Sequence, residues 1–134
     1  MIHDSIMKSY FVDFENKNII FKLKIKNVNQ ELIFKNFFGY KFDNATYSNI
    51  ILDIEEIEIE RFIQRKKEYI NEIYGLGFPI ELPKEYADMK NIEKEERLQL
   101  FLKDNKYKIY TIYASLGLCG FVISKNIELK NEEY

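Results

Sequence analysis

The sequence predicts an α+β fold: one antiparallel, curved sheet of six strands with two helices packed on one face, in the order ββββ-α-α-ββ. Three observations predict it. Apolar residues alternate with polar ones in the first third of the chain, recur at helical spacing in the middle, and alternate again near the end. A strongly curled sheet or partial barrel fits the same pattern. The 134 residues contain no repeat or linker, so we expect a single domain over residues 1–134.

The first two strands are expected over residues 8–14 and 19–26. In the second run, isoleucine, phenylalanine and leucine side chains alternate with mostly lysine side chains, which is typical of a strand with one buried and one wet face. The polar segment 15–18 joins the two runs. We therefore expect a hairpin.

A third strand is expected from Glu31 to about Phe42, with residues 28–30 in or near the turn before it. Strict alternation breaks around Asn36 and Gly39, which indicates a bulge or bend. The segment 43–46 then turns the chain into a fourth strand over 48–54, which could extend to 56. The first third thus predicts a four-stranded meander.

Helical spacing begins at Ile59 and continues to Tyr74, where Gly75 is suited to end the helix. Acidic residues lie near the start of this helix and basic residues lie further along it, in agreement with the helix dipole. A second helix is expected over 92–103, with Leu98, Phe101 and Leu102 on its buried stripe.

The last two strands are expected over 107–114 and 118–124. The short link at 115–117 favours an antiparallel hairpin. From Glu128 onward the chain is polar and highly charged, and we expect a frayed tail there.

Composition narrows the classes of function. The formal net charge is −2, so dense positive charge for nucleic acid or an anionic membrane is missing. Cys119 is the only cysteine, which excludes an intrachain disulfide. No stretch has the roughly 20 apolar residues of a membrane span, and the first residues do not resemble a signal peptide. We expect a soluble, cytoplasmic protein.

No set of catalytic or ligating residues stands out. His3 is the only histidine, and the adjacent Asp4 would point to the other side of an extended chain. Cys119 lies near a turn but lacks a basic partner. The glutamates at 55, 56, 58 and 60 lack the pattern of a calcium loop and suit a solvated helix face. The sequence therefore predicts no catalytic residue, no metal site and no cofactor, and it favours a non-enzymatic protein.

Nucleic-acid binding is also disfavoured. The lysines of the second strand lie on the face opposite Phe21 and Leu23, so an aromatic stacking platform is missing beside them. The heavy aromatic content instead points to a protein interface or to a core rich in tyrosine, and sequence weighs these evenly. The candidate interface residues are Tyr107, Tyr110 and Tyr113 of the late hairpin and Glu55, Glu56 and Glu58 at the start of the first helix.

Several segments together resemble the small bacterial proteins called YxiG-like. They are the opening His3-Asp4-Ser5-Ile6, the paired runs Tyr10–Asp13 and Ile19–Lys22, the acidic segment from Ile54 to Ile63, and Ser115–Val122. The family carries no established activity and no catalytic residues to map. Genes for related small proteins tend to neighbour those for contact-dependent or polymorphic toxins, so the resemblance implies an immunity role.

The first hypothesis for function is therefore a protein-binding module, with a toxin as the partner that an immunity protein would neutralise. An alternative is a small-ligand-binding domain, with a pocket between sheet and helices and residues 75–91 as its lid. An enzyme with a site assembled from scattered Asp, Glu and Tyr is a third hypothesis that no motif supports. Oligomeric state is left open by the sequence.

Overall fold

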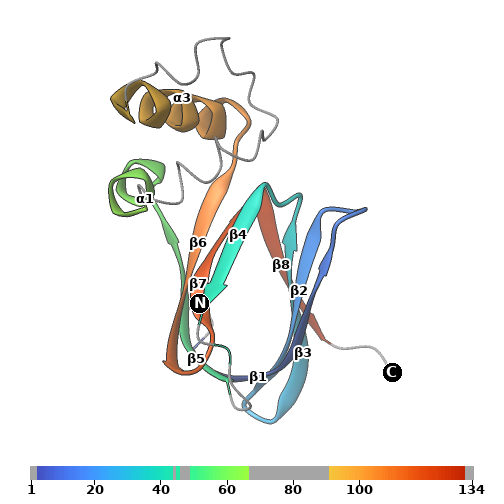
Figure 1. Ribbon diagram of the computed structural model, residues 1–134. Helices are drawn as coiled ribbons and strands as arrows, with labels where there is room; N and C mark the ends of the chain where they lie inside the picture. Colours follow the sequence, from blue (N-terminus) through green and yellow to red (C-terminus); the bar gives the residue numbers. More distant parts are fainter. Residues whose placement is uncertain (1–2, 44, 46–48, 67–90, 132–134) are drawn as a thin grey trace. The chain divides into compact units, whose positions relative to one another are not determined.

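The computed structural model describes residues 3–43, 45, 49–66 and 91–131 (Figure 1). Two compact units contain them: a sheet unit within residues 1–57 and 107–134, and a helical unit within 58–106. The helical unit is an insertion between two strands of the sheet unit.

The described strands form one antiparallel sheet in the order β4-β7-β6-β5-β1-β2-β3-β8. Eight strands replace the six that we predicted, while the α+β class and the antiparallel pairing are confirmed. The strands are β1 His3–Asp13, β2 Asn18–Ile25, β3 Val28–Lys35, β4 Gly39–Asp43, β5 Asn49–Ile57, β6 Lys108–Leu116, β7 Cys119–Ser124 and β8 Asn126–Asn131.

The first hairpin is confirmed as β1 and β2, paired from Ile6–Lys24 to Asp13–Asn18. The Asp13 carboxylate accepts the backbone N–H groups of Glu15 (3.1 Å) and Asn16 (3.0 Å), which fixes the turn. These bonds lower the pKa of Asp13, mainly through Asn16. The alternation predicted for β2 is also confirmed, since Ile19, Phe21 and Leu23 are buried.

The turn between β2 and β3 contains only two residues, Lys26 and Asn27. Their φ angles are 49° and 65°, the left-handed values that a tight two-residue hairpin turn requires. The strand β3 consequently starts at Val28, three residues before the predicted start at Glu31, and residues 28–30 belong to the strand.

The bend predicted near Asn36 and Gly39 is confirmed, because residues 36–38 separate β3 from β4. Asn36 adopts a positive φ of 53°, and the Phe38 N–H donates to the Ile123 carbonyl at 2.7 Å. Opposite this bend, Lys125 links β7 to β8, and its N–H donates to the Lys35 carbonyl at 3.0 Å. Residues 28–43 and 119–131 thus form one bent two-stranded ribbon.

Two predictions of strand pairing are wrong. Residues 128–131 are not a frayed tail but part of β8, which pairs with β3. Its charges misled the sequence interpretation because backbone pairing on an edge strand does not require apolar side chains. The fourth predicted strand, β5, does not follow the third in a meander: it pairs with β1 and β6. The early start of β1 at His3 provides the backbone for this pairing.

The bent ribbon folds the sheet over so that its two halves face each other. Strands β4, β7, β6 and β5 form one wall, and β1, β2, β3 and β8 form the other (Figure 1). Aromatic rings pack across the space between them: Phe21 lies 5.5 Å from Phe42 and Phe34 lies 5.8 Å from Tyr110, measured between ring centroids. The core of the sheet unit lies between these walls.

The helical unit contains α1 (Ile59–Arg65) and α3 (Asn91–Asp104). Leu98 and Leu102 are fully buried, as predicted for the second helix, and Phe62 and Ile63 are buried on α1. The first helix, which we predicted as far as Tyr74, ends at Arg65. The predicted cap Gly75 and the predicted helical part beyond Lys66 lie outside the described residues. Residues 75–90 of the predicted ligand lid also lie outside them. Whether the helices cover one face of the sheet stays a prediction.

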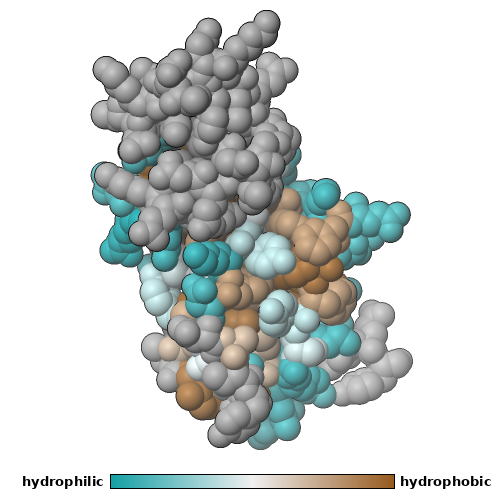
Figure 2. Space-filling model, viewed as in Figure 1, coloured by the Kyte–Doolittle hydropathy of each residue, from teal (hydrophilic) through white to brown (hydrophobic). Residues whose placement is uncertain are grey.

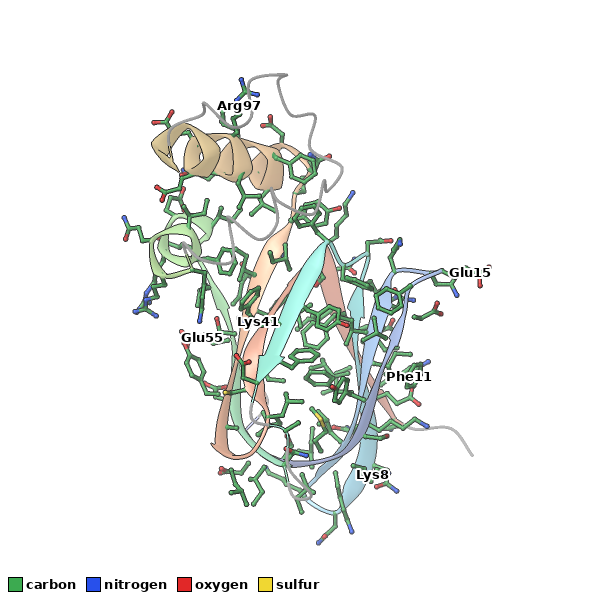
Figure 3. The ribbon with its side chains drawn as sticks, viewed as in Figure 1. Lys8, Phe11, Glu15, Lys41, Glu55 and Arg97 are labelled. Carbon is green, nitrogen blue, oxygen red and sulfur yellow. The ribbon has the colours of Figure 1, made fainter. Side chains whose placement is uncertain are left out.

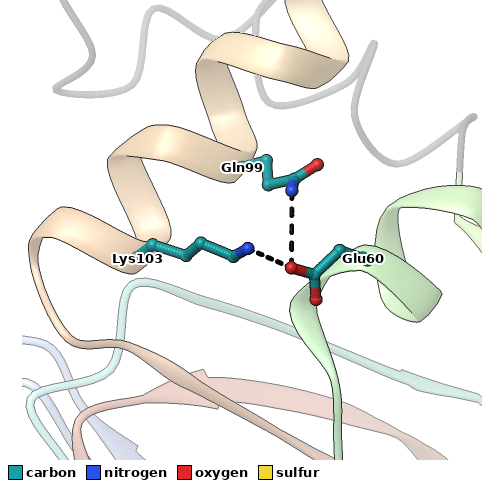
Figure 4. A network of polar contacts seen from close by, with 3 residues as sticks. All are labelled: Glu60, Gln99 and Lys103. Carbon is teal, nitrogen blue, oxygen red and sulfur yellow. Dashed lines mark hydrogen bonds and ion pairs between the residues drawn. The ribbon is translucent and has the colours of Figure 1, made fainter.

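A polar network joins the two helices. The Glu60 carboxylate accepts hydrogen bonds from Lys103 and, at 3.5 Å, from Gln99 (Figure 4). The pKa of Glu60 is lowered, mainly by the hydrogen bond from Lys103. Among the described helices, none is long and apolar enough to cross a membrane.

Candidate functional site

The three tyrosines predicted as an interface do not form one surface. Tyr110 is 4% exposed and packs against Phe34 in the core. Burial, reinforced by the charge of Glu56, raises its pKa. Because Tyr113 is an odd number of residues further along β6, it faces the other side of the sheet and is 37% exposed. For Tyr110, the core interpretation of the aromatic content is therefore the better description.

Tyr107 has a third environment. It precedes β6, its ring lies 5.7 Å from that of Phe38, and the Lys125 ammonium lies 5.4 Å from its ring centroid. Partial burial raises the pKa of Tyr107. These contacts connect Tyr107 to the bend of the ribbon, so its ring supports the fold there.

The acidic candidates are distributed differently from the prediction. Glu55 and Glu56 lie in β5, not at the start of a helix, because the alternation of Ile50, Leu52 and Ile54 continues the strand to Ile57. Glu56 lies 4.0 Å from the Lys108 ammonium on the neighbouring strand. Glu58 is the N-cap residue of α1 in the helical unit. The structure therefore does not bring the three glutamates together on a helix.

A different cluster of side chains, which the sequence analysis did not single out, lies at an open side of the sheet unit. We call it the aromatic surface and define it as Tyr10, Phe14, Phe37, Tyr40 and Phe42. The rings follow one another in contact: Phe14–Phe37 at 6.0 Å, Phe37–Tyr40 at 5.7 Å, Tyr40–Phe42 at 5.0 Å and Phe42–Tyr10 at 5.3 Å between centroids. Phe14 is 61% exposed and Tyr10 is 40% exposed.

Three elements position these rings. Tyr10 projects from the inner face of β1, and Phe14 lies in the turn that follows. Phe37 lies in the bend of the ribbon, where its N–H donates to the Lys17 carbonyl at 2.8 Å and holds the bend against the β1–β2 turn. Tyr40 and Phe42 are two residues apart on β4 and share its inner face. Figure 2 shows apolar side chains gathered on this side of the sheet unit.

Strand edges border the aromatic surface on both sides. Within the described residues, β4 pairs only with β7, and residues 9–13 of β1 pair only with β2. Each of these segments therefore presents backbone N–H and C=O groups that no described strand takes up. The Lys41 side chain projects from the outer face of β4, and Phe11 from the outer face of β1 (Figure 3).

The aromatic surface consists of phenylalanine and tyrosine side chains. Exposed aromatic rings bury a large area at low entropic cost, and a tyrosine hydroxyl adds a hydrogen bond. In the part of the chain that the structure describes, no three His, Cys, Asp or Glu residues are grouped closely enough to hold a metal ion. Cys119 is not part of a disulfide and is partly buried.

The fold and the surface together define an α+β protein whose two-walled antiparallel sheet exposes aromatic rings at one side. Comparison of the chain with protein-family models, with curated proteins and with solved structures found no match.

Proposed function

We propose that the protein is a non-enzymatic protein-binding module and that the aromatic surface contacts its partner. One observation carries the proposal: five rings that follow one another in contact stay partly open to solvent, with Phe14 exposed at 61%. Solitary exposed apolar residues are ordinary, whereas contiguous ones mark interaction sites. Aromatic side chains also dominate the residues that contribute most to protein–protein affinity.

The partner that we propose is a bacterial toxin, which the protein would neutralise in the cytoplasm as an immunity protein. The support for this finer step is the resemblance to YxiG-like proteins, together with a surface suited to contact and not to catalysis. A toxin gene beside the gene for this chain would supply the partner for direct measurement.

Two single substitutions, one in β1 and one in the turn that follows it, test the proposal. Phe14→Ser removes the most exposed ring of the aromatic surface, and Phe11→Ser removes a ring of similar exposure (46%) on the opposite face of β1. Affinity for the toxin encoded beside the gene is measured by calorimetry. We expect Phe14→Ser to weaken binding roughly thirtyfold, as for a central interface residue, and Phe11→Ser to leave it unchanged.

Thermal unfolding of both variants separates binding from folding, because both side chains are exposed and both variants should unfold near the temperature of the unmodified protein. Equal losses of affinity in the two variants would place the contact elsewhere. Failure of the unmodified protein to bind the toxin, or to protect cells that express it, would remove the immunity role.

A further inference from the structure

The edge of β4 carries a charge pattern that is complementary to itself. Its outer face presents Lys41 and Asp43, both exposed, and its inner face presents Tyr40 and Phe42. Neither the Lys41 nor the Asp43 side chain has a hydrogen bond or ion pair with any described residue. Beside these two charges, the backbone of β4 is paired on the β7 side only, within the described residues.

We propose that two copies of this chain associate through β4, paired antiparallel about a two-fold axis at Phe42. In this register, Lys41 of each copy stands opposite Asp43 of the other, so the axis generates two opposite-charge pairs on the outer face. The two Phe42 rings meet on the inner face. A register centred on Lys41 would instead oppose two lysines, and a one-residue slip would place rings opposite charges.

Charge complementarity favours a second copy as the occupant of this edge. A strand that runs antiparallel to β4 needs a base opposite Asp43, an apolar residue opposite Phe42 and an acid opposite Lys41. Read from its N-terminus, that pattern is base–apolar–acid. In the 134 residues it occurs once, as Lys41-Phe42-Asp43, which is the edge itself.

The other edge strand of the sheet, β8, offers a useful contrast. It also carries opposite charges two residues apart, Glu128 and Lys130. Both already have partners on β3, since Glu128 pairs with Lys35 and Lys130 with Glu31. Their charges are therefore used within the chain, whereas those of β4 are available to a second molecule.

This inference does not rest on the proposed function. The ladder involves residues 41–43 and so shares Phe42 with the aromatic surface, while Phe14, whose substitution tests the proposed function, lies outside it. Pairing about Phe42 brings the aromatic surfaces of the two copies side by side, so a dimer would present them as one continuous area. Self-association and toxin binding can each fail while the other holds.

Charge reversal at the two positions provides the test, read by sedimentation velocity of the full chain over a wide range of protein concentration. We expect the unmodified protein to form a dimer as concentration rises. Lys41→Asp places two carboxylates opposite each other at both pairs, and Asp43→Lys does the same with two ammonium groups. For each variant alone, we expect the dissociation constant of the dimer to rise by roughly tenfold or more.

Mixing the two variants gives the sharpest result. In the mixed pair every acid again faces a base, so we expect a dimer that neither variant forms alone, and the double variant Lys41→Asp/Asp43→Lys should also recover self-association. Lys24→Asp, a reversal at an exposed position of β2, is the matched control and should leave the dimer intact. A protein that is monomeric throughout, or single variants that dimerise as well as the unmodified chain, would overturn the proposal.

Discussion

The two arms of the bent ribbon are built from the same two chain segments, but they differ in the burial of their aromatic rings and in the pairing of their charges. In the arm formed by β3 and β8, Phe34 is fully buried and the outer charges pair within the chain, as in the 2.5 Å contact between Lys35 and Glu128. In the arm formed by β4 and β7, Phe42 is only partly buried, and the charges of β4 have no described partner.

The difference follows from the number of neighbouring strands. β3 lies between β2 and β8, which cover it on both sides, whereas β4 ends the sheet beside β7. A covered strand completes its hydrogen bonds and buries its rings, and an edge strand leaves both accessible. The rings and charges of the β3–β8 arm are therefore used within the chain, whereas β4 is the strand at which we propose a further contact.

The largest expected effect is on the free energy of unfolding, when one aromatic ring is removed from each arm. Phe34→Ala removes a fully buried ring that contacts Phe21 and Tyr110, and we expect it to cost about 4 kcal/mol of the free energy of unfolding. Phe42→Ala removes a ring that is only partly buried, so we expect a smaller cost of about 1.5 kcal/mol.

Urea unfolding followed by circular dichroism, at low protein concentration to keep the chain monomeric, gives both values. Equal losses for Phe34→Ala and Phe42→Ala would mean that β4 is as well covered as β3, and the comparison of the arms would fail.

A second prediction concerns what holds β4 to its only described neighbour. Gly120 of β7 lies opposite Phe42 with a φ of 149°, and a Cβ atom added there would lie 1.9 Å from the Lys41 carbonyl oxygen. Because that oxygen belongs to the backbone, β4 would have to shift. We expect Gly120→Ala to cost about 3 kcal/mol of the free energy of unfolding.

The location of the damage can be measured by hydrogen exchange. Protection should fall in β4 and in the paired part of β7, while the β3–β8 arm should keep its protection. Uniform loss over both arms would show that the ribbon unfolds as one unit. An unchanged stability would contradict the close approach at Gly120.

The sequence predicted those parts of the fold that depend on local periodicity. The β1–β2 hairpin, the bend at residues 36–38, the helix with buried Leu98 and the β6–β7 hairpin all follow from patterns within a few residues. It could not predict that β5 returns to β1, because long-range pairing leaves no mark in the local pattern. β8 was missed for a related reason, since its charges face outward and pair with β3.

The candidate site was less accessible to sequence reasoning. The aromatic content predicts either an interface or a core rich in tyrosine, and among the candidates Tyr107, Tyr110 and Tyr113 the structure places Tyr110 in the core. Tyr40 and Phe42 alternate in the way that buried strands do, and only the position of β4 at the end of the sheet exposes them. Edge position is a property of topology, so alternation alone does not reveal which rings face solvent.

The smallest expected effect tests the charges of the covered arm. Hydrogen bonding and attraction from Lys35 lower the pKa of Glu128. Because the folded pKa lies below the unfolded one, the contribution of this carboxylate to stability is complete above the unfolded pKa and is lost as pH falls through the folded pKa. We expect Lys35→Met to raise the pKa of Glu128 in an NMR titration and to destabilise the protein slightly at neutral pH but not in acid.

The exposure of both groups keeps the energetic effect small, so the titration is the decisive measurement. Lys24→Met on β2 is the matched control: it removes an exposed lysine from the same wall without touching β8, and the Glu128 titration should not move. If Lys35→Met also left that titration unchanged, the charges of β8 would be as available as those of β4. The two edges would then no longer differ in the pairing of their charges. The structure would not favour β4 over β8 as the self-associating strand.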